Sequence, residues 1–261
     1  MYARKRFGQH FLHDPAVIAR IIAAIAPRAD DALVEIGPGP GALTAPLLAL
    51  IERLDVVEID RDLAAALQRQ FADRPGLRMH TGDALEFDFA ALARERGRRL
   101  RVIGNLPYNI STPLLFRLLE VGDHLGDLHF MLQKEVVDRI VAPPGSRQYG
   151  RLGVMLAPWV RATKLLDIGP GAFRPPPKVW SALVRLEVLP DPPIWATLPQ
   201  FAAVVTAAFG QRRKTLRNAL AGLLSAAQIS AAGVDPGARA ETLATVQFGH
   251  LALAVAAAAP L

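Results

Sequence analysis

The chain has 261 residues, 51% of them hydrophobic and 21% charged, which suits one large domain with a small one or a single generous α/β domain. It contains no cysteine, which excludes disulfides, thiolate metal sites and thiol nucleophiles. The formal net charge of +6 and the sequence pI of about 10.1 favour a polyanionic partner, but they fit an arginine-rich protein without nucleic-acid role equally well.

The two ends of the chain carry no pattern typical of export or membrane insertion. The basic N-terminus lacks the apolar run of a signal peptide. The alanine-rich stretch 251–261 is too short to span a bilayer, so we expect it to end a packed helix. These features predict a cytoplasmic protein without a membrane partner, and nothing in them requires more than a monomer.

Short apolar segments alternate with helical patterns over the first 140 residues. The expected helices begin at the Asp-Pro pair 14–15, span residues 44–54 and 63–71, and begin again at 113 and 134. The expected strands are residues 32–36, 55–60, 77–80, 100–104 and 128–132. This alternation predicts an α/β fold with a doubly wound, parallel sheet.

The pattern changes in the second half of the chain. Two further strands, 163–168 and 181–188, enclose a stretch too proline-rich to be helical, so we expect them to pair antiparallel at one edge. A proline-rich boundary at 189–193 precedes segments that are helical throughout, with breaks near Gly210, Gly233 and Gly237. The predicted domains are residues 1–190 and a small all-α domain, 191–261.

A glycine-rich turn follows the first expected strand at residues 37–41 (Gly-Pro-Gly-Pro-Gly). Gly37 and Gly39 would allow the backbone to approach a nucleotide-like ligand closely. The turn alone does not separate NAD from S-adenosylmethionine, and it also fits an ordinary tight turn.

Acidic residues follow the next two strands. Glu58 lies 17 positions after Gly41, close to where this fold places a carboxylate on ribose hydroxyls. Asp60 competes for that role but has an alternative one as a helix cap, so we favour Glu58. Asp83, after the third strand, is a candidate acceptor for an adenine amine of the cofactor, although an aspartate there often belongs to a turn.

Residues 105–108 (Asn-Leu-Pro-Tyr) end the fourth strand, beside the first, where open α/β sheets bind ligands. The amine of adenine is a poor nucleophile because its lone pair is delocalised into the ring. The side-chain amide oxygen of Asn105 and the main-chain carbonyl of Leu106 could each accept a hydrogen bond from one N–H of this amine. These two hydrogen bonds would aim the lone pair of the nitrogen at a methyl sulfonium. Pro107 would stiffen the turn and Tyr108 would offer a ring face, so that positioning replaces a metal or strong base.

Three segments suggest RNA contacts. In the proline loop 173–181, Phe173 is a candidate for stacking a splayed base, although a buried Phe is the alternative. The other two segments are basic and could contact phosphates or form a solvated face. They comprise Arg4, Lys5 and Arg6 at the N-terminus, and Arg212, Arg213, Lys214 and Arg217 at an expected helix start.

Taken in order, these motifs resemble the ribosomal RNA small-subunit adenine dimethyltransferase family, which acts on 16S rRNA in bacteria. The resemblance covers nearly the whole chain. It rests on residues 5–9, 105–113, 130–136 and 149–152, the proline loop, and 211–215.

The resemblance implies a Rossmann-like class I S-adenosylmethionine methyltransferase domain, with a mostly parallel sheet and an antiparallel edge strand, plus the C-terminal all-α domain. It implies that two adjacent adenosines of the 3′-terminal hairpin loop each receive two methyl groups, within the 30S subunit or its precursor. One departure is His10, where the family often has Asn. The implied cofactor contacts are His10, Leu12, Gly37, Glu58, Asp83 and Asn105.

Three alternatives stay open at this point. The sister family methylates large-subunit 23S rRNA and confers macrolide resistance. A ribosome-assembly factor with secondary catalysis belongs to a different class of function. An NAD oxidoreductase would rest on the glycine turn alone.

Overall fold

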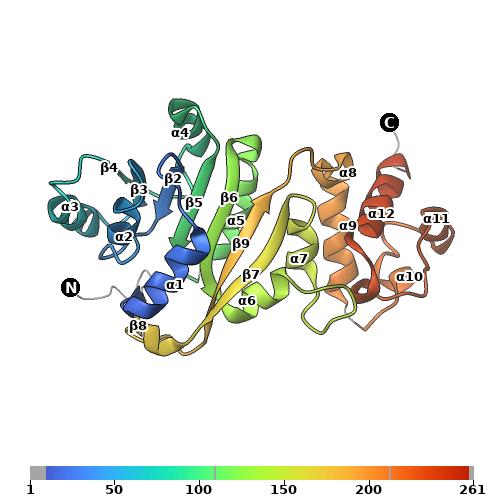
Figure 1. The fold of residues 1–261 in the computed structure, drawn as a ribbon. Coiled ribbons are helices and arrows are strands. Elements are labelled where there is room, and N and C mark those ends of the chain that lie inside the picture. The colour runs from blue at the N-terminus through green and yellow to red at the C-terminus, as the bar shows by residue number, and fades with distance from the viewer. Residues whose placement is uncertain (1–9, 109, 212, 259–261) are drawn as a thin grey trace. The chain divides into compact units, whose positions relative to one another are not determined.

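The computed structural model describes residues 10–108, 110–211 and 213–258, which divide into two compact units (Figure 1). The sheet unit comprises Met1–Val137 and Arg161–Val188, and the helical unit comprises Asp138–Val160 and Leu189–Leu261.

The sheet unit is built on a seven-stranded sheet with the order β4-β3-β2-β5-β6-β9-β7. Strands β2 to β6 are parallel, and β9 pairs antiparallel with β6. β7 lies beyond β9 at the edge, so the two late strands are neighbours as expected. The strands are β2 (Ala32–Ile36), β3 (Leu54–Glu58), β4 (Leu77–Thr81), β5 (Leu100–Asn105), β6 (Leu125–Gln133), β7 (Val160–Ile168) and β9 (Ser181–Val188).

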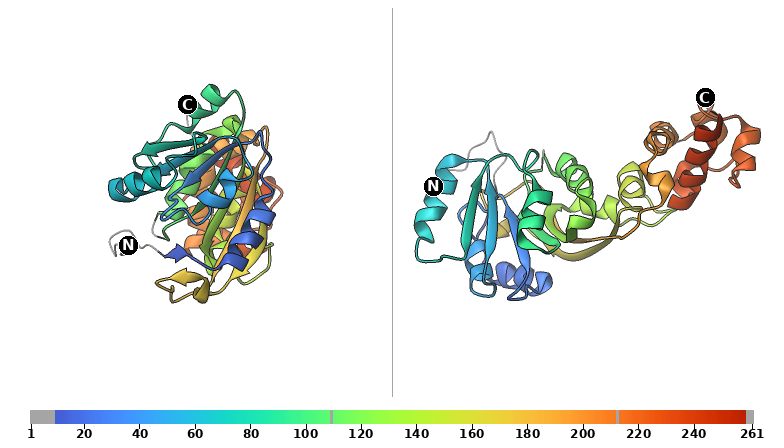
Figure 2. Two further views of the ribbon diagram at one scale, coloured as in Figure 1. Left: turned by 60° about the vertical axis from the view of Figure 1, so that its left-hand side comes forward. Right: turned by 90° about the horizontal axis from the view of Figure 1, so that it is seen from above.

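Helices cover both faces of this sheet, α1 and α2 on one and α4 and α5 on the other (Figure 2). Apolar residues of α1 and α2, such as Ile21 and Leu47, share a buried cluster with Leu33 and Ile103 of the sheet. The helices are α1 (Pro15–Ile25), α2 (Thr44–Leu48), α3 (Arg61–Gln70), α4 (Phe89–Arg96), α5 (Ser111–Leu119) and α6 (Lys134–Ile140). The predicted α/β class and Rossmann-like arrangement are confirmed.

One local prediction differs from the structure, and one helix was not predicted. The helix expected over residues 44–54 ends at Leu48, and Leu54 already belongs to β3, where it pairs with Leu33 and Leu77. Helix α4 was not anticipated, although Asp88 caps its start and Gly97 ends it in the left-handed conformation.

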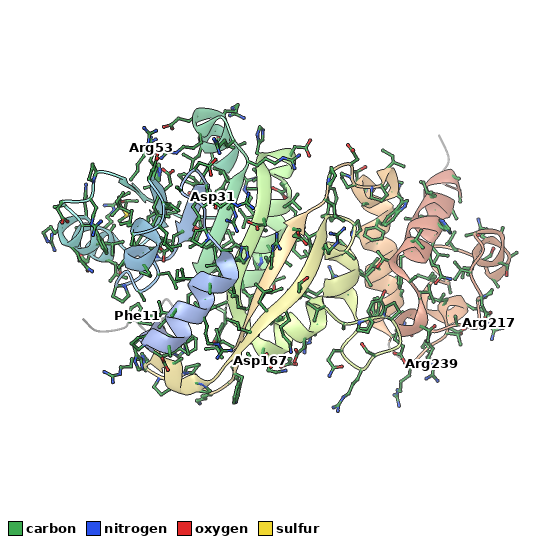
Figure 3. The ribbon with its side chains drawn as sticks, in the orientation of Figure 1. Phe11, Asp31, Arg53, Asp167, Arg217 and Arg239 are labelled. Atoms are coloured by element: carbon green, nitrogen blue, oxygen red, sulfur yellow. The ribbon has the colours of Figure 1, made fainter. Side chains whose placement is uncertain are left out.

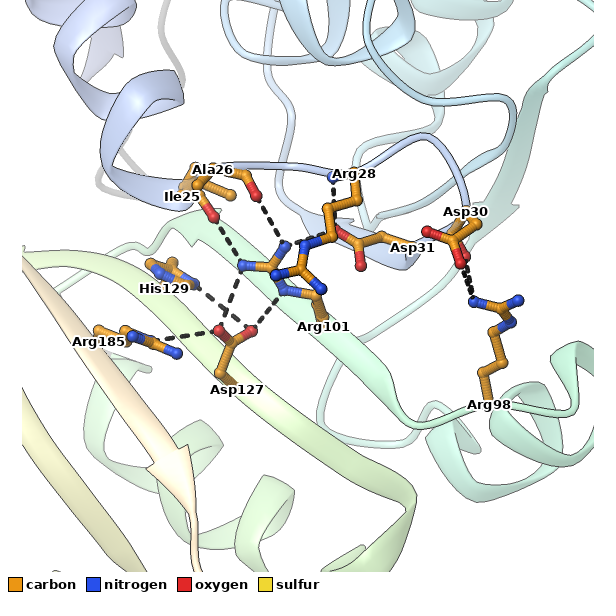
Figure 4. A network of polar contacts seen from close by, with 10 residues as sticks. All are labelled: Ile25, Ala26, Arg28, Asp30, Asp31, Arg98, Arg101, Asp127, His129 and Arg185. Carbon is orange, nitrogen blue, oxygen red and sulfur yellow. Dashed lines mark hydrogen bonds and ion pairs between the residues drawn. The ribbon is translucent and has the colours of Figure 1, made fainter.

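A polar network holds the amino ends of β5 and β6 against α1 (Figure 4). The Arg101 guanidinium donates to Asp127 at 2.8 and 3.2 Å, to Asp31, and to the Ile25 carbonyl at 2.6 Å. It thereby satisfies a carbonyl in the last turn of α1 that has no partner within the helix. This network is at the opposite end of the strands from the carboxyl edge.

The helical unit has its own core. Phe209 of α9 (Pro199–Gly210) stacks on Phe248 of α12 (Thr245–Ala258), with 5.6 Å between ring centroids. The unit also contains α7 (Arg151–Leu156), α8 (Ile194–Thr197), α10 (Leu216–Ala219) and α11 (Ala226–Ala231).

A single boundary at residue 190 is therefore wrong, because residues 138–160 belong to the helical unit. Tyr149 and Val154 of this segment are buried in the helical core, and the Tyr149 hydroxyl donates to the Leu243 carbonyl at 2.8 Å. The start of the later segment, at Leu189, matches the proline-rich boundary. The predicted helix breaks at Gly210 and Gly233 are present.

Within the described ranges, no helix combines the length and apolar character that crossing a membrane requires.

Candidate functional site

A cavity opens at the carboxyl edge of the sheet unit, where β2, β3, β4 and β5 end. Open α/β sheets bind ligands at this place, beside the strand where the chain order reverses. Seven predicted contacts line the cavity: His10, Leu12, Gly37, Gly39, Glu58, Asp83 and Asn105. Three members of the predicted catalytic turn, Leu106, Pro107 and Tyr108, line it too.

The glycine turn forms one wall of this cavity in a conformation that favours glycine. Gly37 and Gly39 have φ angles of 63° and 56°. A Cβ on Gly37 would point into open space, whereas a Cβ on Gly39 would come within 2.9 Å of the Phe11 ring. Phe11 is labelled in Figure 3. The turn therefore leaves room for a ligand against its main chain.

The two acidic candidates, Glu58 at the end of β3 and Asp60 just after it, have separate roles. Asp60 caps α3, accepting the amide N–H groups of Asp62 and Leu63. Glu58 is buried and lines the cavity, and its carboxylate accepts the Asp60 amide at 2.9 Å. Burial raises the pKa of Glu58, while hydrogen bonds from the amides of Asp60 and Gly39 oppose that shift. The preference for Glu58 as the cavity carboxylate is consistent with this arrangement.

Asp83 lies in a turn and at the cavity, the two positions that the sequence left open for it. Its Oδ1 accepts the Leu85 amide at 2.9 Å in a turn, and the residue also lines the cavity.

Asn105, at the end of β5, is oriented by the segment that precedes α1. Its Nδ2 donates to the main-chain carbonyl of His10 at 2.8 Å. That bond occupies one N–H of the amide, and it identifies Oδ1 as the acceptor atom of a residue that lines the cavity. His10 itself is fixed by a 2.8 Å hydrogen bond between Nδ1 and the Pro175 carbonyl.

The turn after Asn105 is held by several bonds. The Leu106 amide donates to the Met131 carbonyl at 3.3 Å, and the Ile110 amide to the Pro107 carbonyl at 3.2 Å. The Tyr108 hydroxyl lies 2.9 Å from Ser181 Oγ. Burial raises the pKa of Tyr108, opposed by that hydrogen bond, so the phenol stays neutral near pH 7.

Phe173 does not present its ring at the site, so the prediction that it stacks a base is wrong. It is 2% exposed and belongs to the core of the sheet unit. Strand β8 (Phe173–Arg174) pairs with β1 (Phe11–Leu12), which places Phe173 opposite Leu12. Pairing of the proline loop with the N-terminal segment turns this large apolar ring inward, where its burial is favourable.

The basic candidates fall into two groups. Arg4, Lys5, Arg6 and Arg212 lie outside the described residues. Arg213 and Lys214 are exposed in the connection between α9 and α10, and exposed Arg217 lies within α10, so the expected helix start is only partly helical. Figure 3 shows Arg217 pointing outward from the helical unit.

The site also contains residues that the sequence did not single out. Glu35 is buried in the cavity wall and accepts the Thr44 hydroxyl at 2.6 Å. Ile59 lines the cavity while 48% exposed, an apolar surface next to Glu58. Ser181 would have been hard to find, because its role depends on the distant Tyr108.

Comparison with known proteins places this site in a family. The sequence pattern described as ribosomal RNA adenine dimethylase matches residues 1–256. The chain is 57% identical over 245 residues to the ribosomal RNA small subunit methyltransferase A of Methylococcus capsulatus, covering 94% of this chain and 95% of that protein. It is 55% identical to the Pseudomonas aeruginosa protein of the same name, with 96% and 93% covered.

Two solved structures share the fold at 24% identity. A dimethyladenosine transferase from Plasmodium falciparum gives a TM-score of 0.76, with 93% of this chain and 96% of that chain covered. The 23S rRNA methyltransferase ErmE gives 0.74, with 94% and 99% covered. At this identity the likeness supports the fold and does not choose between rRNA substrates.

Proposed function

The chain belongs to the ribosomal RNA adenine dimethylase family, and on that premise we propose that it dimethylates the N6 amines of two adjacent adenosines in 16S rRNA. The methyl donor is S-adenosylmethionine, and the target is the loop of the 3′-terminal hairpin within the 30S subunit or its precursor. The reaction thereby serves small-subunit ribosome biogenesis. Relatives more than 50% identical carry the name of a small-subunit rRNA methyltransferase, which favours 16S over 23S rRNA.

The observation that carries the proposal is the orientation of Asn105. With Nδ2 bound to the His10 carbonyl, Oδ1 can accept an N–H of the target amine at the cavity wall. The main-chain carbonyl of Leu106 can accept the second N–H. Two acceptors on the same amine draw its nitrogen away from planarity and free its lone pair for attack.

The cavity fits S-adenosylmethionine by the chemistry of its wall. The glycine turn offers main chain without side chains, Glu58 suits ribose hydroxyls, and Asp83 suits an adenine amine. When bound, this cofactor would supply a methyl group on a positively charged sulfur and leave as a neutral thioether. The amine would release one proton to solvent for each methyl group that it gains. The residues then have mainly to orient the amine and exclude water.

The target base must leave its stack to reach this cavity, and a hairpin loop makes that step inexpensive. We propose that Arg213, Lys214 and Arg217, with the basic residues outside the described ranges, hold phosphates around the loop. Their contribution should weaken as salt concentration rises.

The first test is Asn105→Ala. We expect methylation of unmethylated 30S particles to fall by about 100-fold or more, because the amine loses one of its acceptors. RNA binding should persist. Gln70→Ala, which removes an exposed amide on α3, is the matched control and should methylate normally. Normal methylation by Asn105→Ala would exclude the catalytic assignment.

The second test compares subunits. With labelled cofactor, we expect label in the RNA of 30S particles and none in 50S particles. Mass spectrometry of the product should place two methyl groups on each of two adjacent adenosines. Label in 50S particles alone would support the 23S alternative and overturn the proposal.

A further inference from the structure

The most exposed aromatic side chain at the edge of the candidate site is Trp180, which is 54% exposed. Tryptophan is highly buried on average, since its ring contributes much to burial free energy. The benzo part of this ring lies against Gly169, where an added Cβ would meet it at 3.7 Å. The ring is thus supported on one side by main chain and leaves much of its surface to solvent.

Trp180 is held at the same edge of the sheet as the cavity. Because β9 runs antiparallel to β6, its first residue, Ser181, pairs with Gln133 at the carboxyl end of β6. The Lys134 amide donates to the Trp180 carbonyl at 2.8 Å and fixes the main chain there. The next residue, Ser181, bonds Tyr108 at 2.9 Å, so Trp180 is one residue from a direct contact with the catalytic turn.

Two cations of the same loop accompany the ring. Arg174 and Lys178 are exposed, and within the described ranges neither makes an ion pair or a side-chain hydrogen bond. The prolines between them restrict the main chain, and the Pro175 carbonyl is bonded to His10. A rigid loop therefore displays one aromatic ring and two uncommitted positive charges, while its other ring, Phe173, is buried.

We infer that Trp180, Arg174 and Lys178 form a docking surface for single-stranded rRNA next to the methylated base. This inference rests on the proposed function and names a contact surface for its substrate. A neighbouring base of the hairpin loop stacks on Trp180, since every base offers a π face, while the two cations bind phosphates. A loop that exposes one aromatic ring and two cations suits a polyanion with aromatic bases better than it suits an apolar protein partner.

The test compares Trp180→Ala and Trp180→Phe with wild type, using unmethylated 30S particles and a synthetic 3′-terminal hairpin. Trp180→Ala should weaken binding of both RNAs by about 5- to 150-fold, the loss expected for one stacked base. The apparent KM for 30S particles should rise, and the affinity for S-adenosylmethionine should stay unchanged. Trp180→Phe should retain most of the affinity because a phenyl ring still stacks.

Charge and surface controls complete the design. Arg174→Gln and Lys178→Gln should each flatten the slope of log affinity against log salt by about 0.7. Ile194→Ala removes a side chain that is 71% exposed in the helical unit and should bind RNA as wild type does.

The binding and methylation results test the docking surface and the proposed function separately. Equal hairpin binding by wild type and Trp180→Ala overturns the docking surface, even if both methylate 16S rRNA. Loss of 30S binding with unchanged hairpin binding points to a ribosomal protein and also overturns it. A wild type that methylates no 30S particles would refute the proposed function, and the hairpin titration would still decide the role of Trp180.

Discussion

Glu35 shows how a single residue of the site can couple stability to pH. It is a buried carboxyl on β2, and its Oε2 accepts a hydrogen bond from the Thr44 hydroxyl. Burial raises its pKa from 4.5 to about 7, the Thr44 bond opposes the shift and the Glu58 charge adds to it. Between these two values the folded protein keeps a proton that the unfolded chain releases. Stability contributed by this group therefore falls as pH rises from about 4.5 through 7.

We expect Glu35→Gln to raise the free energy of unfolding at pH 8 by up to about 3 kcal/mol, because it removes a buried charge and retains an acceptor for Thr44. Below pH 4.5, where the carboxyl is protonated in both states, the gain should vanish. Urea unfolding at both pH values measures the difference. Glu52→Gln, at an exposed position, should show no such pH-dependent gain. The same gain for Glu35→Gln at both pH values would contradict the assignment.

At this scale some assignments could be made from the sequence and others could not. The roles of Glu58 and Asp60 could be distinguished from the sequence, because the end of a strand and the cap of a helix are both recognised from local pattern. Phe173 was not, because its burial depends on a strand pair with the distant segment Phe11–Leu12. The same pairing brings the His10 carbonyl to Asn105.

Among the elements, the glycine turn depends most on conformation. Gly39 combines a left-handed φ of 56° with a close approach to Phe11 of β1. A side chain here would strain the turn and push the strand whose neighbour, His10, orients Asn105. The turn thus shapes the cavity wall and supports the segment that orients the Asn105 amide.

We expect Gly39→Ala to weaken S-adenosylmethionine binding by about 10-fold or more, from about 1–2 kcal/mol of left-handed strain together with the clash. Isothermal titration calorimetry measures this loss. Gly171→Ala is the control, because a Cβ there meets nothing within 4 Å. If Gly39→Ala bound the cofactor like wild type, the turn would not be the wall of its site.

The positions of the buried strands could be predicted from the sequence, whereas the end of α2 could not. Buried parallel strands such as β2 and β5 are short apolar runs, so their positions were clear. The end of α2 was not clear, because Leu54 is equally apolar in a helix or a strand and only its partners on β2 and β4 decide.

At the scale of the whole molecule, the chain forms two hydrophobic cores, and each core is built from two stretches that are not consecutive in the sequence. Residues 138–160 join the helical unit although they lie between strands of the sheet unit. The Tyr149 hydroxyl is part of this attachment, since it donates to the Leu243 carbonyl.

We expect Tyr149→Phe to destabilise the helical unit by about 1–2 kcal/mol, because the buried Leu243 carbonyl loses this donor. Hydrogen exchange should show reduced protection in α9 and α12. Affinity for S-adenosylmethionine should stay unchanged, as the cavity lies in the sheet unit. Ser230→Ala, which removes an exposed hydroxyl, should leave protection intact. Unchanged exchange in Tyr149→Phe would mean that this bond does not stabilise the unit.

The sequence by itself determined the α/β class, the order of the strands along the chain, the cavity residues at strand ends and the family. These properties follow from local periodicity and from motifs that each occupy a few consecutive residues. Only the tertiary structure decided that Phe173 is buried and that Trp180 is exposed. It also decided how the Asn105 amide is oriented and that residues 138–160 belong to the helical unit. Each of these outcomes depends on contacts between segments far apart in the chain. The local sequence is compatible with several arrangements there, and burial and hydrogen bonding between the segments determine which one forms.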